Sequence, residues 1–186
     1  MKKFLIVAAA VAALSAVPAS AQSSNTLTYD LNAQVASVCG VFNFTGTNVT
    51  VNFGALAATP AATLVAQAAG SATYRCNAVA GFTRTISSLN NGFLTLDRVA
   101  TTDANRRIPF SMSHGGGNGL GFAFQQLIAP VVGSFGGSTA FLAGQTGGVN
   151  FQTNGVQAAA GGNGAPGTTV FAGNYQDVVT ISVTAN

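Results

Sequence analysis

Apolar and polar residues alternate along much of the chain, which is the pattern of strands with one buried face. Runs of this kind begin at Leu27, Val49 and Ala72, and the last extends from Tyr175 to Thr184. Helical periodicity is scarce: residues 61–69 are alanine-rich but too few for a stable helix, so we expect a loop with a turn or two. Many short strands with frequent turn signals predict an all-β sandwich or barrel.

Two local signals refine this picture. The Asn90-Asn91-Gly92 sequence separates strand-like runs at 82–89 and 93–99, and it predicts a hairpin because Asn and Gly accept positive φ. Pro109 lies within the run at 108–112 and has no N–H to donate, so it predicts an edge position. The last run is expected to be one continuous strand.

The N-terminus has the pattern of a secretory signal. Lys2 and Lys3 precede an apolar run at 4–14 and small residues at 18–21, which predicts cleavage after Ala21. The remaining 165 of 186 residues suit one domain. They hold five arginines, four aspartates and no glutamate or lysine, a net charge of +1. This charge gives no support to a nucleic-acid partner, and the missing lysine excludes P-loop chemistry.

Residues 113–168 are rich in glycine, with 16 glycines among 56 residues. Leucine, isoleucine and phenylalanine are interspersed among them, which makes the stretch too apolar for a solvated linker. No aspartate occurs in it, so the calcium-binding glycine repeats are excluded. We expect short strands joined by tight glycine turns.

The sequence gives little support for a catalytic site. His114 is the only histidine and precedes three glycines, like the oxyanion loop of some esterases. Such an enzyme also needs a Gly-x-Ser-x-Gly turn and a second histidine, and the nearest candidate turn, at 136–140, lacks its final glycine. Asp177 interrupts the apolar face of the last run, and a hydrogen-bonded structural role is expected for it. We expect no enzyme, no cofactor and no metal site.

Cys39 and Cys76 are the only cysteines. In an exported chain a single disulfide is the default, and it would stabilise the fold by ~4 kcal/mol in the chain-entropy model. A metal site would need more ligands than two cysteines and one histidine supply.

Several segments together resemble one bacterial family. They are residues 36–39, which end at Cys39, then Asn52-Phe53-Gly54, then Cys76, and finally residues 172–177 leading into the last strand. This combination is similar to the spore coat protein U family, the pilins of the archaic chaperone–usher pathway. The resemblance covers residues 24–110 and 165–186. It implies an incomplete immunoglobulin-like sandwich completed by a donor strand.

The resemblance also implies how the protein works. Residues 22–36 form an N-terminal donor-strand arm, and residues 37–186 form the pilin domain. A periplasmic chaperone and an outer-membrane usher handle the subunit, and copies of itself or related pilins are its neighbours in a cell-surface fibre for adhesion and biofilm formation. The side chains that would enter the neighbour alternate along the arm: Leu27, Tyr29, Leu31, Ala33 and Val35.

Alternatives remain open at this stage. The arm could be an ordinary first strand packed within its own domain. The length and alternation also permit a small outer-membrane β-barrel, although aromatic residues at the membrane interfaces and a terminal aromatic residue are missing. A secreted monomeric module that binds glycans or surfaces through its glycine-rich loops is the third possibility.

Overall fold

The computed structural model describes residues 27–43, 46–159 and 167–186. The predicted signal peptide lies outside these residues. The chain divides after Val35 into two units, and residues 36–186 form the second one. Within the first unit, residues 27–35 have no regular secondary structure and are exposed. No helix in the described part of the chain is long and apolar enough to cross a membrane.

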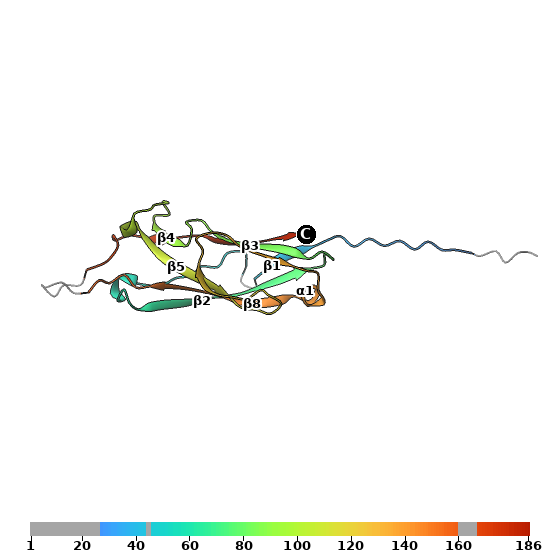
Figure 1. The fold of residues 1–186 in the computed structure, drawn as a ribbon, viewed down its shortest axis with the longest axis horizontal. Helices are drawn as coiled ribbons and strands as arrows, with labels where there is room; N and C mark the ends of the chain where they lie inside the picture. The colour runs from blue at the N-terminus through green and yellow to red at the C-terminus, as the bar shows by residue number, and fades with distance from the viewer. Residues whose placement is uncertain (1–26, 44–45, 160–166) are drawn as a thin grey trace, which may run out of the picture. The chain divides into compact units, whose positions relative to one another are not determined.

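In the described residues of this second unit the strands form two antiparallel sheets, as the alternating pattern predicts (Figure 1). The larger sheet has the strand order β1 (Cys39–Phe42), β2 (Leu64–Cys76), β8 (Gln145–Asn154), β5 (Arg107–His114), β4 (Phe93–Leu96) and β9 (Tyr175–Gln176), with β6 (Phe122–Gln126) also paired to β5. The smaller sheet has the order β10 (Val179–Ala185), β3 (Phe82–Ser88) and β7 (Val131–Phe135). The described part of the chain also contains three short helices: η1 (Leu56–Ala58), η2 (Ala104–Arg106) and α1 (Thr139–Ala143).

The core lies between the two sheets and is rich in aromatic rings. Phe82 on β3 stacks on Phe135 of β7 and meets Phe141 of α1 edge-on, each at a centroid distance of 4.9 Å. Tyr74 from β2 and Met112 from β5 have no exposed surface. Large side chains from both sheets therefore interdigitate, and this burial is the main force that holds the sandwich together.

The expectation of a loop at residues 61–69 is wrong from Leu64 onward. Strand β2 begins at Leu64 and pairs with β8, in a register that opposes Leu64 to Asn154. The ladder is interrupted between Ala68 and Ser71, where Gly70 adopts a φ of +80°. The long ladder with β8 outweighs the helical preference of the alanines, because a helix of so few residues would be only marginally stable.

The turn at residues 90–92 forms as predicted, but the hairpin does not. Asn91 and Gly92 have φ values of 54° and 79°, and the Phe93 N–H donates to Asn90 O at 3.2 Å. The strands on either side belong to different sheets, because β3 pairs with β10 and β7 while β4 pairs with β5 and β9. The turn carries the chain across the sandwich.

Two further expectations need correction. Pro109 is not on an edge strand, since β5 lies between β8 and β4. The ladder between β5 and β8 begins only at Phe110, so the missing N–H of Pro109 removes none of the hydrogen bonds of that ladder. The last run is two strands: β9 pairs with β4, and β10 pairs with β3 after a break at Asp177 and Val178.

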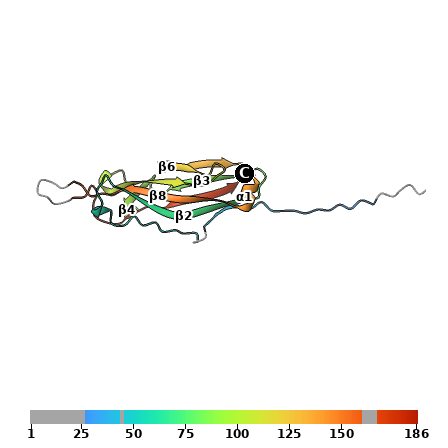
Figure 2. The same ribbon diagram turned by 90° about the horizontal axis from the view of Figure 1, so that it is seen from below.

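The glycine-rich region does contain short strands, as expected. Within its described part, β6 and β7 are five residues each, and β8 is a longer strand of ten. The helix α1 was not expected; Ser138 caps it by accepting a hydrogen bond from the Ala140 N–H at 3.2 Å. Both β6 and β8 pair with β5, and Figure 2 shows β6 above β8.

Candidate functional site

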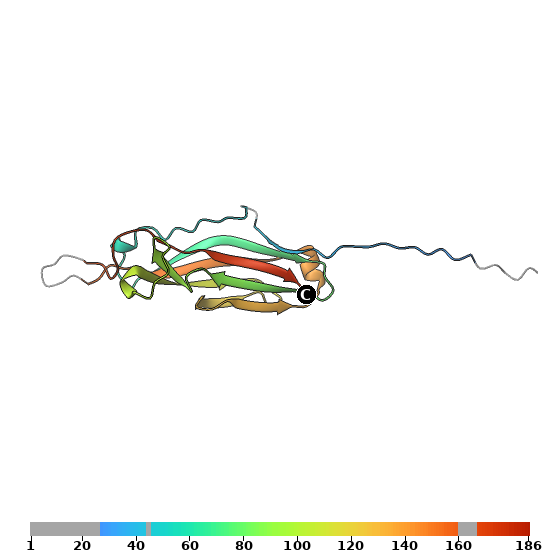
Figure 3. The same ribbon diagram turned by 90° about the horizontal axis from the view of Figure 1, so that it is seen from above.

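Strand β10 has one free edge. Within the described residues it pairs only with β3, so its other edge presents unpaired backbone groups (Figure 3). Val179, Ile181 and Val183 point inward but are only half-buried, whereas the intervening Thr180 and Ser182 are exposed. Large aliphatic residues on the inner face of a closed sandwich are normally fully buried. The cover over this part of the core is therefore incomplete.

Residues 47–53 form the second wall of the same region. The sequence predicts a strand here, and the alternation is present: Val51 and Phe53 are half-buried while Thr50 and Asn52 are exposed. These residues form no strand, however, and no backbone hydrogen bond joins them to another described segment. This stretch has the side-chain pattern of a strand without a strand partner.

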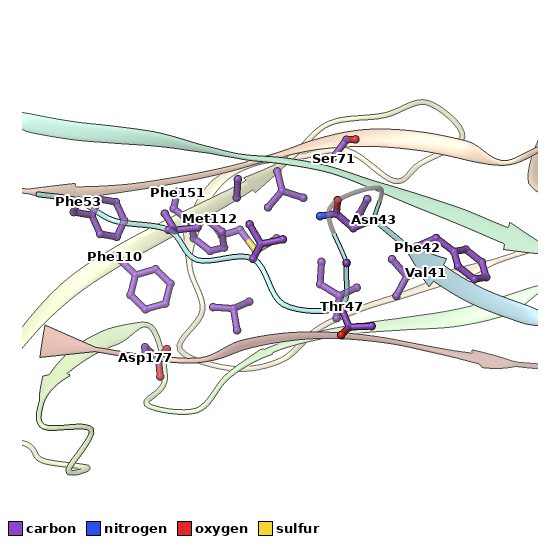
Figure 4. A pocket seen from close by; sticks show the side chains of 18 of the residues that line it. Val41, Phe42, Asn43, Thr47, Phe53, Ser71, Phe110, Met112, Phe151 and Asp177 are labelled. Carbon is purple, nitrogen blue, oxygen red and sulfur yellow. The ribbon is translucent and has the colours of Figure 1, made fainter.

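A groove of about 590 Å³ lies between these two walls. Its floor comes from the larger sheet and includes Phe110, Met112 and Phe151, and Figure 4 shows these side chains with Phe53 toward one end and with Phe42 toward the other. The described residues that line it are Val41, Phe42, Asn43, Gly46, Thr47, Val49, Val51, Phe53, Ala69, Ser71, Ala72, Leu94, Phe110, Met112, Val149, Phe151, Asp177, Val179 and Ile181. The groove is thus an apolar channel bordered by extended backbone.

A second hollow of about 890 Å³ continues past the groove. It shares Val49, Val51 and Phe53 with the groove and extends along residues 170–179. The two hollows therefore both border residues 47–53.

The disulfide predicted between Cys39 and Cys76 is present. The two residues are direct partners in the β1–β2 ladder. The bond ties the start of the domain to the central sheet, and the chain then runs through β1 to the wall at residues 47–53. A disulfide also indicates an oxidising location outside the cytoplasm.

Asp177 lies at the break between β9 and β10 and lines the groove. Its carboxylate accepts hydrogen bonds from Ser88 Oγ, from the Asn90 N–H and from Asn90 Nδ2. This arrangement confirms the structural role expected from the sequence. It uses the turn between β3 and β4 to fix the point at which the chain passes from one sheet to the other.

His114 is held in the core by contacts of both its ring nitrogens. Its Nε2 is 2.9 Å from the Tyr74 hydroxyl, and its Nδ1 is 2.5 Å from Gly115 O. Burial lowers the pKa of His114 below its usual 6.5, and the nearby Arg84 charge acts in the same direction. The side chain is therefore a neutral core residue at neutral pH.

The five predicted donor side chains belong to the first unit. Leu31 is 92% exposed and Leu27 72% exposed, and both lie on a stretch without secondary structure. Sequence reasoning identified the alternation at residues 49–53, which lie in the second wall of the groove, and the inward face of the last strand. It did not identify Phe110 and Phe151 as the floor of a groove. Phe110 is buried and Phe151 is half-buried, and their apolar alternation gave no sign that a groove would border them.

Comparisons with known proteins do not place the chain in a family. No protein-family model matches the chain, and no curated protein matches it. The resemblance to the spore coat protein U family therefore stays a prediction from the residues that carry it.

Proposed function

We propose that this protein is a structural subunit of a bacterial surface fibre, exported through the periplasm and polymerised head to tail. In this proposal its domain is an incomplete immunoglobulin-like sandwich, and the N-terminal arm of one copy fills the groove of the next. The observation that carries the proposal is the groove itself. It has an apolar floor and is bordered by two extended segments, β10 and residues 47–53. Among the described residues, neither segment has a backbone partner on the side that faces the groove.

The chemistry of the groove suits an inserted strand. Such a strand could exchange backbone hydrogen bonds with β10 on one side and with residues 47–53 on the other. Its alternate side chains would point to the floor formed by Phe110, Met112 and Phe151. These contacts would complete the burial of Val179 and Ile181, which are now half-buried.

The arm is long enough to run along the whole of β10. From Leu27 to Val35 it would span ~26 Å as a strand, compared with ~20 Å for β10 from Val179 to Ala185. Burial of its four large side chains would contribute roughly 6–12 kcal/mol before ordering costs are subtracted. A contact that joins the arm of one copy to the groove of another does not close on itself, so repetition gives a filament.

Other parts of the proposal rest on the resemblance alone. These are the periplasmic chaperone that fills the groove before assembly, the outer-membrane usher, and the role in adhesion and biofilm formation. The disulfide supports export to an oxidising compartment.

A pair of arm variants tests the proposal. Leu31→Asp places a carboxylate on the apolar face of the arm, and Asn32→Asp places the same charge on the polar face. Surface material would be compared on a denaturing gel, unboiled and boiled. We expect a ladder of multiples that collapses on boiling for the natural protein and for Asn32→Asp, and its loss for Leu31→Asp. A normal ladder from Leu31→Asp would contradict the arm assignment.

A further inference from the structure

A buried cation lies in the smaller sheet, away from the groove. Arg84 of β3 points into the core and is only 3% exposed. Its Nη1 donates to Leu120 O at 2.8 Å, while its Nε is buried and has no hydrogen-bond partner among the described residues. The guanidinium carbon lies 5.2 Å from the ring centre of Phe135 and 5.6 Å from that of Phe122.

This cation has no carboxylate partner in the described part of the chain, where the only ion pair joins Arg106 to Asp103. Removing a charge from water costs several kcal/mol. The aromatic faces offset part of that cost, at about 0.5–2 kcal/mol each. Even so, the guanidinium has a planar set of donors that matches a carboxylate, and its Nε–H is not used.

A hollow of about 500 Å³ opens beside Arg84. One side is β7, and the other is the turn at residues 118–121 that leads into β6. Arg84 is the only charged residue among the described residues that line it. The ring of Phe122 and the small polar side chains of Asn118 and Ser138 also line it, so a ligand would meet one positive charge, hydroxyl and amide groups, and an aromatic face.

We propose that this hollow binds an acidic sugar through its carboxylate. The carboxylate pairs with the Arg84 guanidinium, the sugar hydroxyls contact Asn118 and Ser138, and the sugar ring packs on Phe122. The Ser138 hydroxyl remains able to donate, because its bond to the Ala140 N–H uses it only as an acceptor. The residues of this hollow differ from those that line the groove, so sugar binding can be tested independently of strand exchange.

Saturation-transfer NMR on the purified mature protein tests the proposal, because it observes the small ligand and tolerates a polymer. Sodium glucuronate is the probe, and glucose is its neutral counterpart. We expect transfer to glucuronate, displacement of it by acetate but not by acetamide, and a much weaker signal from glucose. Equal signals from the two sugars, or none from glucuronate, would overturn the proposal.

Gly136 provides matched variants at the rim. A Cβ there would meet no atom within 4 Å, and its φ lies outside the left-handed region, so both variants should fold. Gly136→Asp adds a negative charge to the hollow and should weaken glucuronate binding by about tenfold or more. The Asn side chain of Gly136→Asn has nearly the same shape without the charge, so this variant should keep its glucuronate binding. Equal binding by the two variants would contradict the assignment of the carboxylate to Arg84.

Discussion

The Asp177 carboxylate accepts a hydrogen bond from the backbone N–H of Asn90 at 2.9 Å, although the two residues are 87 positions apart. Oδ1 also accepts from Asn90 Nδ2 at 3.0 Å, and Oδ2 accepts from Ser88 Oγ at 2.5 Å. One side chain thus ties the turn after β3 to the start of β10. Because β10 borders the groove, this contact fixes the position of one wall.

Removal of this carboxylate should destabilise the domain. Asp177→Ala leaves the Asn90 N–H without its acceptor in a part-buried site, and such a loss typically costs about 1–3 kcal/mol. Asp177→Asn keeps one acceptor oxygen and should cost less. Urea unfolding of the three proteins measures the difference. An unchanged free energy of unfolding in Asp177→Ala would show that the contact contributes nothing.

The contact also explains where sequence reasoning failed. The run from Tyr175 to Thr184 alternates except at Asp177, which interrupts its apolar face, so period alone predicts one strand. The break at Asp177 depends on a partner 87 positions away, which no local pattern shows. The turn at Asn91 and Gly92 was predictable because its positive φ values are a local property. Which sheet each flanking strand joins was decided by packing across the whole domain.

The disulfide should be complete and stabilising. Cys39 and Cys76 should both resist alkylation in the denatured, unreduced protein and both react after reduction. Reduction should lower the free energy of unfolding by ~4 kcal/mol, because the unfolded chain regains the freedom of the closed loop. Mass spectrometry counts the labels, and urea unfolding measures the loss. Labels on unreduced protein would contradict the bond.

Stability should fall on mild acidification. The pKa of His114 in the folded protein is below its unfolded value of about 6.5, so the unfolded chain binds more protons between these two pKa values. The free energy of unfolding should therefore decrease as pH falls below 6.5, with a slope of up to about 1.4 kcal/mol per pH unit. His114 is the only histidine, so His114→Asn should remove the slope between pH 6.5 and 5. A slope that persists in the variant must come from another group.

Residues 47–53 should change their hydrogen exchange on polymerisation. Their amides have no backbone partner in another described segment of the single chain, so they should exchange rapidly in the monomer. In polymers they should gain protection together with β10, because an inserted strand would pair with both. The amides of β2, already paired with β8, serve as the internal control. Protection of β10 alone would exclude residues 47–53 as a pairing partner.

The candidate site was predictable only in part. Alternation at residues 49–53 and 179–183 marks two inward faces, and both are inward in the structure. That both faces border one groove follows from the fold of the whole domain, which places β10 at the edge of its sheet. Arg84 gave no signal, because a lone arginine in an alternating run looks like a surface residue until the rings of Phe122 and Phe135 are seen around it.

Mixing two defective subunits tests the central claim most directly. Leu31→Asp impairs the arm and leaves the groove intact, whereas Ile181→Asp impairs the groove and leaves the arm intact. Co-expressed with the export machinery, each alone should give only monomer on an unboiled gel. Together they should give a dimer that dissociates on boiling and no higher multiple, since one arm fits one groove and growth then stops. Monomer alone in the mixture, or a full ladder from either variant, would contradict head-to-tail strand donation.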